Sequence, residues 1–199
     1  MMYLCSNITG GDYRFLPKNI NITGQKKMTT TKTILYLARH GETVDNANHI
    51  MQGQTPGRLN DLGRAQARNL AMQLGCTYFD AFVSSDLQRA KDTCSIVATT
   101  HGQEVTTTPL LRERDWGSFT GKYLPDLKHA EWPQDIESTQ DLKLRATRFL
   151  DFIRTHYSGK KVLAVGHGII NKAIQSVYYD KEMKDIAPMK NAELRILTL

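Results

Sequence analysis

The feature that most constrains the fold of this chain is the alternation of short apolar runs with longer amphipathic segments. The apolar runs predict strands at residues 33–38, 79–84, 104–107, 161–165 and 192–198. The amphipathic segments predict helices at 60–74, 86–99, 139–156 and 169–178. Strands that alternate with helices predict an α/β fold, with a mostly parallel central sheet between two helical layers in a three-layer α/β/α arrangement.

The chain has 199 residues, which fits one globular domain. Residues 1–31 show neither helical nor strand periodicity and end near a further methionine, Met28, so we expect an N-terminal extension, either a solvated tail or a mis-assigned start. The folded domain is expected at 32–199. Within it, residues 112–137 contain several glycines and prolines and two tryptophans, which predicts loop and short helix over a possible site.

Composition narrows the classes of protein. No apolar run approaches the roughly 20 residues of a membrane-spanning helix, and the start lacks the pattern of a secretory signal, so we expect a cytoplasmic protein without membrane contact. The three cysteines, Cys5, Cys76 and Cys94, are not spaced as a disulfide framework or a zinc site. Five basic residues and one acidic residue lie in 1–33, so this segment accounts for +4 of the net charge of +6. The remaining +2 does not indicate a nucleic-acid partner.

Reactive side chains follow three of the predicted strands at the point where each strand ends. The first strand leads into Arg39 and His40, the second toward Arg89, and the fourth to His167. Ligands of open α/β sheets bind beyond the carboxyl ends of the strands, so we expect these four side chains to lie together.

Two histidines and two arginines at one sheet edge suit a phosphoryl group, because guanidinium groups match phosphate oxygens bidentately. A neutral imidazole can attack phosphorus, and this scheme needs no metal and no other cofactor. The chain has no Walker loop, no Asp-x-Asp pair, no cysteine followed six positions later by arginine and no Gly-x-Ser-x-Gly motif. His40 is therefore the best candidate nucleophile.

The sequence resembles the histidine phosphatase (phosphoglycerate mutase-like) superfamily over roughly residues 32–199. The resemblance is carried by Arg39-His40-Gly41-Glu42-Thr43 with Asn46, Gln52-Gly53, Leu59 to Gly63, Ser84 to Ala90, Leu111-Arg112-Glu113 and Val165-Gly166-His167-Gly168. It implies a phosphoglycerate mutase-like fold, with 32–199 as the catalytic domain.

The resemblance also implies site roles. His40 would be the phosphorylated nucleophile and Glu113 the proton donor, with His167 as the third catalytic residue. The substrate-binding residues would be Arg39, Gly41, Asn46, Gln52, Gly53, Arg89 and Gly168, the glycines allowing the backbone to approach the phosphate.

The function predicted from these residues is metal-independent hydrolysis of a small phosphorylated metabolite. A cofactor-dependent phosphoglycerate mutase is the alternative within the family, although the segment between Glu113 and His167 is short for a mutase. The alternative of another class is an inactive protein-binding or regulatory module. The sequence indicates neither the natural substrate nor the oligomeric state, and Lys172 replaces the arginine of many relatives.

Overall fold

A computed structural model describes residues 32–199 of the chain, and the expected N-terminal extension at 1–31 lies outside the described residues. Five strands form one sheet in the order β3-β2-β4-β1-β5. Their bounds are β1 Ile34–Arg39, β2 Ala81–Ser85, β3 Val105–Thr108, β4 Lys161–Gly166 and β5 Leu194–Thr198. β1, β2, β3 and β4 are parallel, and β5 pairs antiparallel with β1 at the edge, so the prediction of a mostly parallel sheet is confirmed.

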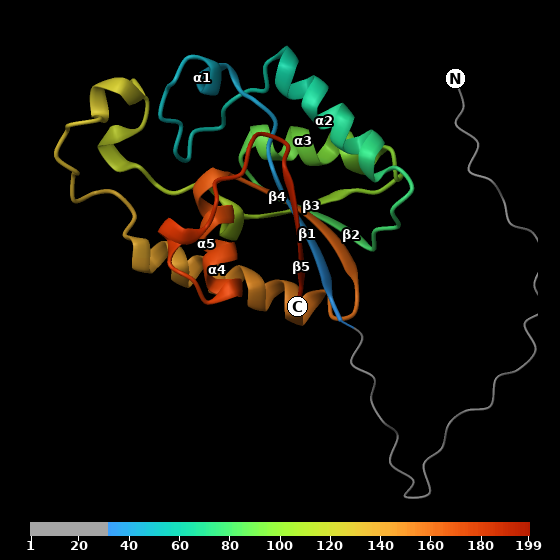
Figure 1. The fold of residues 1–199 in the computed structure, drawn as a ribbon. Helices are drawn as coiled ribbons and strands as arrows, with labels where there is room; N and C mark the ends of the chain where they lie inside the picture. Colours follow the sequence, from blue (N-terminus) through green and yellow to red (C-terminus); the bar gives the residue numbers. More distant parts are fainter. Residues whose placement is uncertain (1–31) are drawn as a thin grey trace, which may run out of the picture. The chain divides into compact units, whose positions relative to one another are not determined.

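Helices cover both faces of the sheet, as Figure 1 shows. They are α2 (Asp61–Leu74), α3 (Gln88–Thr99), α4 (Thr139–His156) and α5 (Gly168–Tyr179). One buried cluster joins α4 and α5 to Leu35 and Leu37 of β1, and a second joins α2 and α3 to Ala38. Because successive strand residues point to opposite faces, β1 serves both clusters, and the three-layer α/β/α architecture is confirmed.

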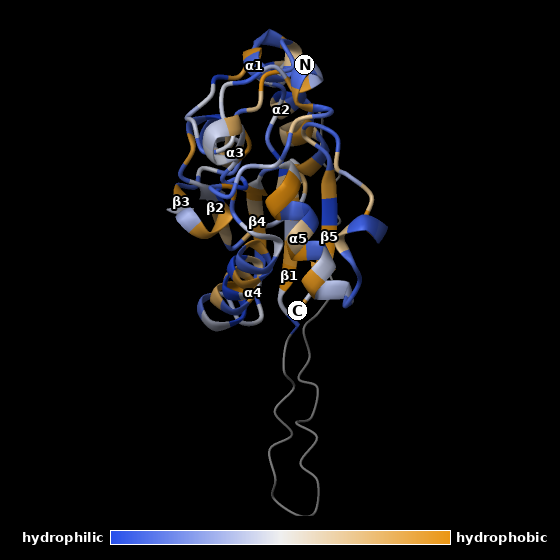
Figure 2. Cartoon of the chain, turned by 90° about the vertical axis from the view of Figure 1, so that its left-hand side faces the viewer, coloured by the Kyte–Doolittle hydropathy of each residue, from blue (hydrophilic) through white to orange (hydrophobic). Residues whose placement is uncertain are grey.

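Hydropathy follows this layering. In Figure 2 the central strands carry apolar residues, and α4 alternates apolar and polar residues along its length, as an amphipathic helix does. Among the described residues, no helix is both long and apolar enough to cross a bilayer.

The helices begin close to where the sequence predicts them. Asn60 caps α2, its side chain accepting a hydrogen bond from the amide of Gly63 at 2.7 Å. α3 begins at Gln88, two residues later than expected, because Ser85 Oγ accepts a bond from the Leu87 amide and keeps this turn out of the helix.

One short helix, α1 (Val44–Ala47), was not predicted from the sequence. It exists through a reciprocal capping box. The Thr43 side chain accepts from the amide of Asn46, and the Asn46 side chain accepts from the amide of Thr43. Four residues are too few to give a periodic pattern.

The segment over the carboxyl edge of the sheet, residues 112–137, is called the roof segment here. It consists of loop and two short 3₁₀ helices, Gly117–Phe119 and Leu124–Leu127, as the glycines and prolines predicted. A third 3₁₀ turn, Pro109–Leu111, leads from β3 into it.

Candidate active site

The parallel pairing of β1 and β4 brings the two candidate histidines together. Arg39 is in register with Gly166, so His40 and His167 follow paired positions at the same sheet edge. The His40 amide also donates to the Gly166 carbonyl at 3.1 Å. The two imidazole centroids lie 5.0 Å apart, with 60° between the ring planes.

His40 is held as one particular tautomer. Its Nδ1 lies 2.7 Å from the Gly41 carbonyl oxygen, which can only accept, so Nδ1 carries the proton. Burial, followed by the charges of Arg89 and Arg39, holds the pKa of His40 well below its usual value. The ring is therefore neutral near pH 7, and Nε2 has a free lone pair.

His167 is fully buried next to His40. Neither ring nitrogen has a hydrogen-bond partner within residues 32–199. Burial lowers the pKa of His167 far below its usual value, and the nearby charge of Arg89 lowers it further. A neutral imidazole still carries one N–H, and a buried N–H without a partner is unusual in a folded protein.

Arg39 places a charge beside this pair. Its Nη1 donates to the Met189 carbonyl at 2.7 Å, whereas its buried Nε has no partner in the described part of the chain. Burial lowers the pKa of Arg39. The guanidinium lies close to Gly168, where a Cβ would be 3.5 Å from Arg39 Cζ, an ordinary van der Waals contact.

Arg89 is the second buried arginine, with 1% of its surface exposed. Nη2 donates to Gly53 O at 2.7 Å, and Nη1 donates to the carbonyls of Thr55 and Pro56. Nε, again, is unpartnered among the described residues. Burial lowers the pKa of Arg89 to about 10, so the guanidinium remains charged at pH 7. Its hydrogen bonds to the three carbonyls fix the loop at 53–56.

Glu113 lies at the N-terminus of α5. Its Oε1 accepts from the amides of Arg114, Ile169 and Ile170 at 2.8, 3.1 and 3.2 Å, and Oε2 lies 3.2 Å from the Ile169 amide. Free amides at a helix start attract negative charge, so this position orients a carboxyl group.

Arg145 of α4 fixes the turn that carries Glu113. It pairs with Glu137 at 2.9 and 2.6 Å and donates to the carbonyls of Leu110, Arg112 and Glu113. Sequence reasoning missed Arg145. The available signal was its place on the apolar stripe of the predicted helix, three residues after Leu142 and four before Phe149.

These groups border a pocket of about 330 Å³. Of the residues predicted for the site, those that line it are Arg39, His40, Asn46, Gln52, Gly53, Arg89, Glu113 and Gly168. Other lining residues include Met51, Trp116, Leu124 and Lys172. The charged residues of this lining are the cations Arg39, Arg89 and Lys172 and the single anion Glu113. The lining therefore has a net positive charge and suits an anion.

Two predicted residues do not line this pocket. His167 is fully buried and is not among the described residues that line the pocket. Gly41 packs against the start of α2, where a Cβ would come within 2.4 Å of the Gly63 carbonyl oxygen. Its amide donates to Thr93 Oγ1 at 3.0 Å, so this glycine serves the close approach of two backbones.

Asn46 and Gln52 both line the pocket, but their side-chain oxygens differ in hydrogen bonding. Asn46 Oδ1 accepts from the Thr43 amide and lies 3.3 Å from Asn191 Nδ2, so its acceptor is used within the protein. Gln52 Oε1 is buried without a partner in residues 32–199.

The family model described as histidine phosphatase superfamily (branch 1) matches residues 35–199, which is most of the chain. The chain belongs to the histidine phosphatase superfamily. The histidine pair and both arginines lie within the matched residues.

Similar superfamily members carry several names. A metal-independent phosphoserine phosphatase of Arabidopsis thaliana is 36% identical over 165 residues, covering 74% of this chain and 69% of the relative. A protein named "Probable phosphoglycerate mutase GpmB" of Enterobacter is 32% identical over 149 residues, covering 68% and 69%. A mycobacterial glucosyl-3-phosphoglycerate phosphatase, solved in complex with VO3, has a TM-score of 0.75 and 26% identity, covering 82% of this chain and 91% of that one.

Proposed function

We propose that this histidine phosphatase superfamily member hydrolyses a small phosphorylated metabolite, with His40 accepting the phosphoryl group. The observation that carries the proposal is the neutral His40 ring, whose Nδ1 donates to the Gly41 carbonyl and leaves Nε2 as the lone-pair nitrogen. The same site holds buried nitrogens of Arg39, Arg89 and His167 that have no hydrogen-bond partner among residues 32–199. An anion that accepts hydrogen bonds would satisfy these groups together.

The first step transfers the phosphoryl group. The Nε2 lone pair of His40 attacks phosphorus in line, and the ester P–O bond breaks. Arg39, Arg89 and the His167 N–H offset the charge on the equatorial oxygens. Glu113 acts as the general acid and gives a proton to the leaving oxygen, because an alkoxide is a poor leaving group without one.

The second step releases phosphate. Water attacks phosphorus, the P–N bond breaks and its electron pair returns to His40 Nε2. Glu113 takes the proton from the attacking water, which restores its protonated form. The positive charges that act in both steps belong to the chain itself, so we infer that hydrolysis needs no added metal. One relative is named metal-independent, which supports this inference.

Three kinds of similar protein bear on the substrate. They are named for phosphoserine, glucosyl-3-phosphoglycerate and phosphoglycerate, each a small phosphorylated molecule. We infer a substrate of this general size, acted on by residues 32–199 as the catalytic domain, with Asn46, Gln52, Gly53 and Gly168 around the phosphate.

The test is hydrolysis of a phosphomonoester panel in the presence of EDTA, comparing the wild type with His40→Ala and the distant control Arg154→Ala. We expect phosphate release by wild type and control, and none by His40→Ala. Rapid quenching with ³²P-labelled substrate should trap an acid-labile, base-stable phosphoenzyme in the wild type and in Arg154→Ala, but not in His40→Ala. Loss of activity in EDTA, or full activity of His40→Ala, would overturn the proposal.

The same panel separates the other functions. The mutase-named relatives favour including 3-phosphoglycerate with a bisphosphate primer. Exchange between phosphoglycerate isomers that outpaces hydrolysis would establish phosphotransfer instead. Folded protein that does neither would fit a binding or regulatory module.

A further inference from the structure

The pocket of about 330 Å³ in the candidate active site is called the phosphate pocket here. A second hollow adjoins it under the roof segment. It has a volume of about 560 Å³ and is called the aromatic groove here. Its apolar lining is formed mainly by Met51, Trp116, Phe119, Tyr123, Leu124 and Trp132. Met51, Trp116 and Leu124 also line the phosphate pocket, so the two hollows are neighbours that share these three residues.

The rings of the aromatic groove are held in place before any ligand binds. Trp132 meets Trp116 at a centroid distance of 5.7 Å and Phe119 at 6.3 Å, both edge to face. The Arg114 guanidinium lies 4.9 Å from the ring centroid of Trp116 and 5.4 Å from that of Trp132. These contacts fix both indoles, which reduces the entropy that a ligand would have to supply.

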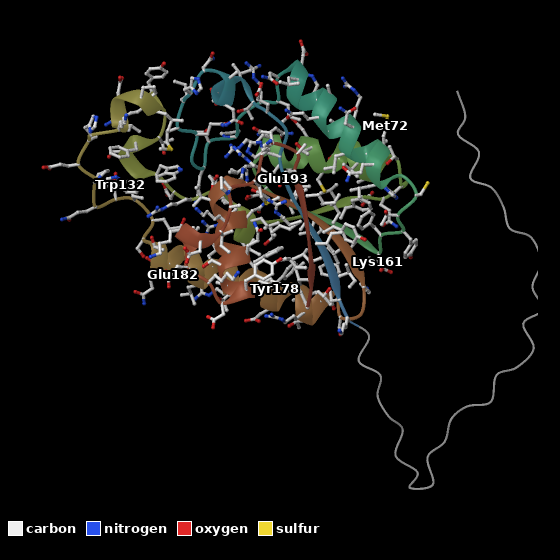
Figure 3. The ribbon with its side chains drawn as sticks, viewed as in Figure 1. Met72, Trp132, Lys161, Tyr178, Glu182 and Glu193 are labelled. Carbon is white, nitrogen blue, oxygen red and sulfur yellow. The ribbon has the colours of Figure 1, made fainter. Side chains whose placement is uncertain are left out.

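Trp132 nevertheless leaves 62% of its surface exposed, and Tyr123 leaves 45%. Figure 3 shows Trp132 on the roof segment, far from Met72 on α2. An ordered, exposed aromatic cluster beside a polar pocket is typical of a ligand site. Lys128 and His49 are the nitrogen-bearing polar side chains in the lining. Within residues 32–199 no carboxylate lines the aromatic groove, so an apolar ligand fits better than a cation.

We propose that the preferred substrate has a leaving group bearing an aromatic ring, which lies in the aromatic groove while its phosphate lies between Arg39 and Arg89. This inference rests on the proposed phosphatase function and names its substrate class, an aryl or arylalkyl phosphomonoester. A compact leaving group such as that of phosphoserine would occupy the phosphate pocket alone and leave the aromatic groove unused.

The experiment compares kcat/KM for 2-naphthyl phosphate and phosphoserine in the wild type, Trp132→Ala, Trp132→Phe and Met72→Ala. Met72 is the matched control, because it is also a large exposed apolar residue and lies on α2. Trp132→Ala should lower kcat/KM for 2-naphthyl phosphate about tenfold, mainly through KM, and change that for phosphoserine less than about twofold. Trp132→Phe should restore most of the loss, and Met72→Ala should change neither.

A binding measurement adds an independent readout. The chain has two tryptophans, and both line the aromatic groove. 2-Naphthylmethyl phosphonate, which is not hydrolysed, should therefore change the tryptophan emission of the wild type, and Trp132→Ala should bind it about tenfold more weakly. Inorganic phosphate should bind both proteins equally.

The outcomes separate this inference from the function on which it rests. Equal kcat/KM losses for both esters in Trp132→Ala, or unchanged naphthyl phosphonate affinity, would overturn the aromatic groove as a substrate site and leave phosphatase activity standing. Failure of the wild type to hydrolyse any ester would instead overturn the proposed function. Because the Trp132 side chain is mostly exposed, the thermal unfolding midpoint of Trp132→Ala should stay close to that of the wild type. This measurement checks that the variant is folded.

Discussion

Arg145 and Glu137 form a two-point ion pair, with Nε to Oε1 at 2.9 Å and Nη2 to Oε2 at 2.6 Å. Both side chains are mostly buried, at 16% and 14% exposure. The same guanidinium reaches the backbone carbonyls of Arg112 and Glu113. The pair therefore ties α4 to the turn that carries the candidate proton donor.

Replacing Arg145 with alanine should lower the free energy of unfolding by about 3 kcal/mol, because it leaves the buried Glu137 carboxylate without its partner. It should also lower kcat by about 10²-fold, since a small displacement of Glu113 misplaces the proton transfer. Urea denaturation and steady-state kinetics measure the two effects.

Arg154→Ala is the matched control on the same helix. Arg154 pairs with Asp151 at 3.0 Å, but the two side chains are 47% and 62% exposed, so its removal should cost less than about 0.5 kcal/mol. Equal stability losses for Arg145→Ala and Arg154→Ala would contradict the role given to the Arg145–Glu137 pair.

The two buried histidines predict a pH-dependent stability. Burial and the arginine charges hold the pKa values of His40 and His167 far below the unfolded value of 6.5. Below about pH 6.5 the unfolded state binds more protons than the folded state, so the free energy of unfolding falls as the pH falls. Each histidine should contribute up to about 1.4 kcal/mol per pH unit in this range, and nothing further above it.

Urea denaturation at intervals from pH 5 to 8 measures this slope. The double variant His40→Gln, His167→Gln should have a flatter profile below pH 6.5, because glutamine does not titrate. His156→Gln serves as the control, since His156 is exposed. A double variant with the wild-type slope would show that other groups are responsible.

Gly63 should tolerate no side chain. A Cβ there would lie 1.9 Å from the Glu42 carbonyl oxygen, so Gly63→Ala must push α2 away from the loop after His40. We expect a loss of about 3 kcal/mol in stability and a large loss of activity. Gly75, at the other end of α2, has a right-handed backbone and no atom closer than 3.5 Å to such a Cβ. Gly75→Ala should be neutral or stabilise by about 0.5 kcal/mol, and thermal unfolding compares the two.

If Glu113 protonates the leaving oxygen, the effect of Glu113→Gln should depend on the leaving group. For an alkyl ester such as phosphoserine, the rate constant for phosphorylation of His40 should fall by about 10²- to 10³-fold. For p-nitrophenyl phosphate it should fall much less, because p-nitrophenolate departs without a proton. Rapid-quench kinetics of the phosphorylation step measures both, and an equal decrease for the two esters would argue against the proton-donor role.

The fold could be predicted largely because its signal is periodic. Leu35 and Leu37 face one helical layer and Ala38 the other, which is why the strand at 33–38 reads as a continuous apolar run. The position of His40 and His167 followed from the same reasoning, because parallel strands end at one edge.

Other features depend on contacts between distant segments, which periodicity does not encode. The hydrogen bonds from Arg89 to the carbonyls of Gly53, Thr55 and Pro56 could not be predicted, because they depend on the conformation of the loop. The packing of Gly41 against Gly63 could not be predicted either, because it depends on how closely two distant backbone segments approach each other. The aromatic groove depends on the tertiary positions of Trp116 and Trp132, which the sequence assigned only to a segment of loop and short helix.

The partner that fixes the His40 tautomer is the carbonyl oxygen of Gly41, an atom that every amino acid possesses. No side-chain substitution can delete this acceptor, so a complete mutational scan would leave the interaction invisible. Only chemistry on the main chain itself, such as replacing the following amide by an ester to weaken that carbonyl, can vary it. In this protein, the atom that orients the proposed nucleophile cannot be removed by exchanging one encoded amino acid for another.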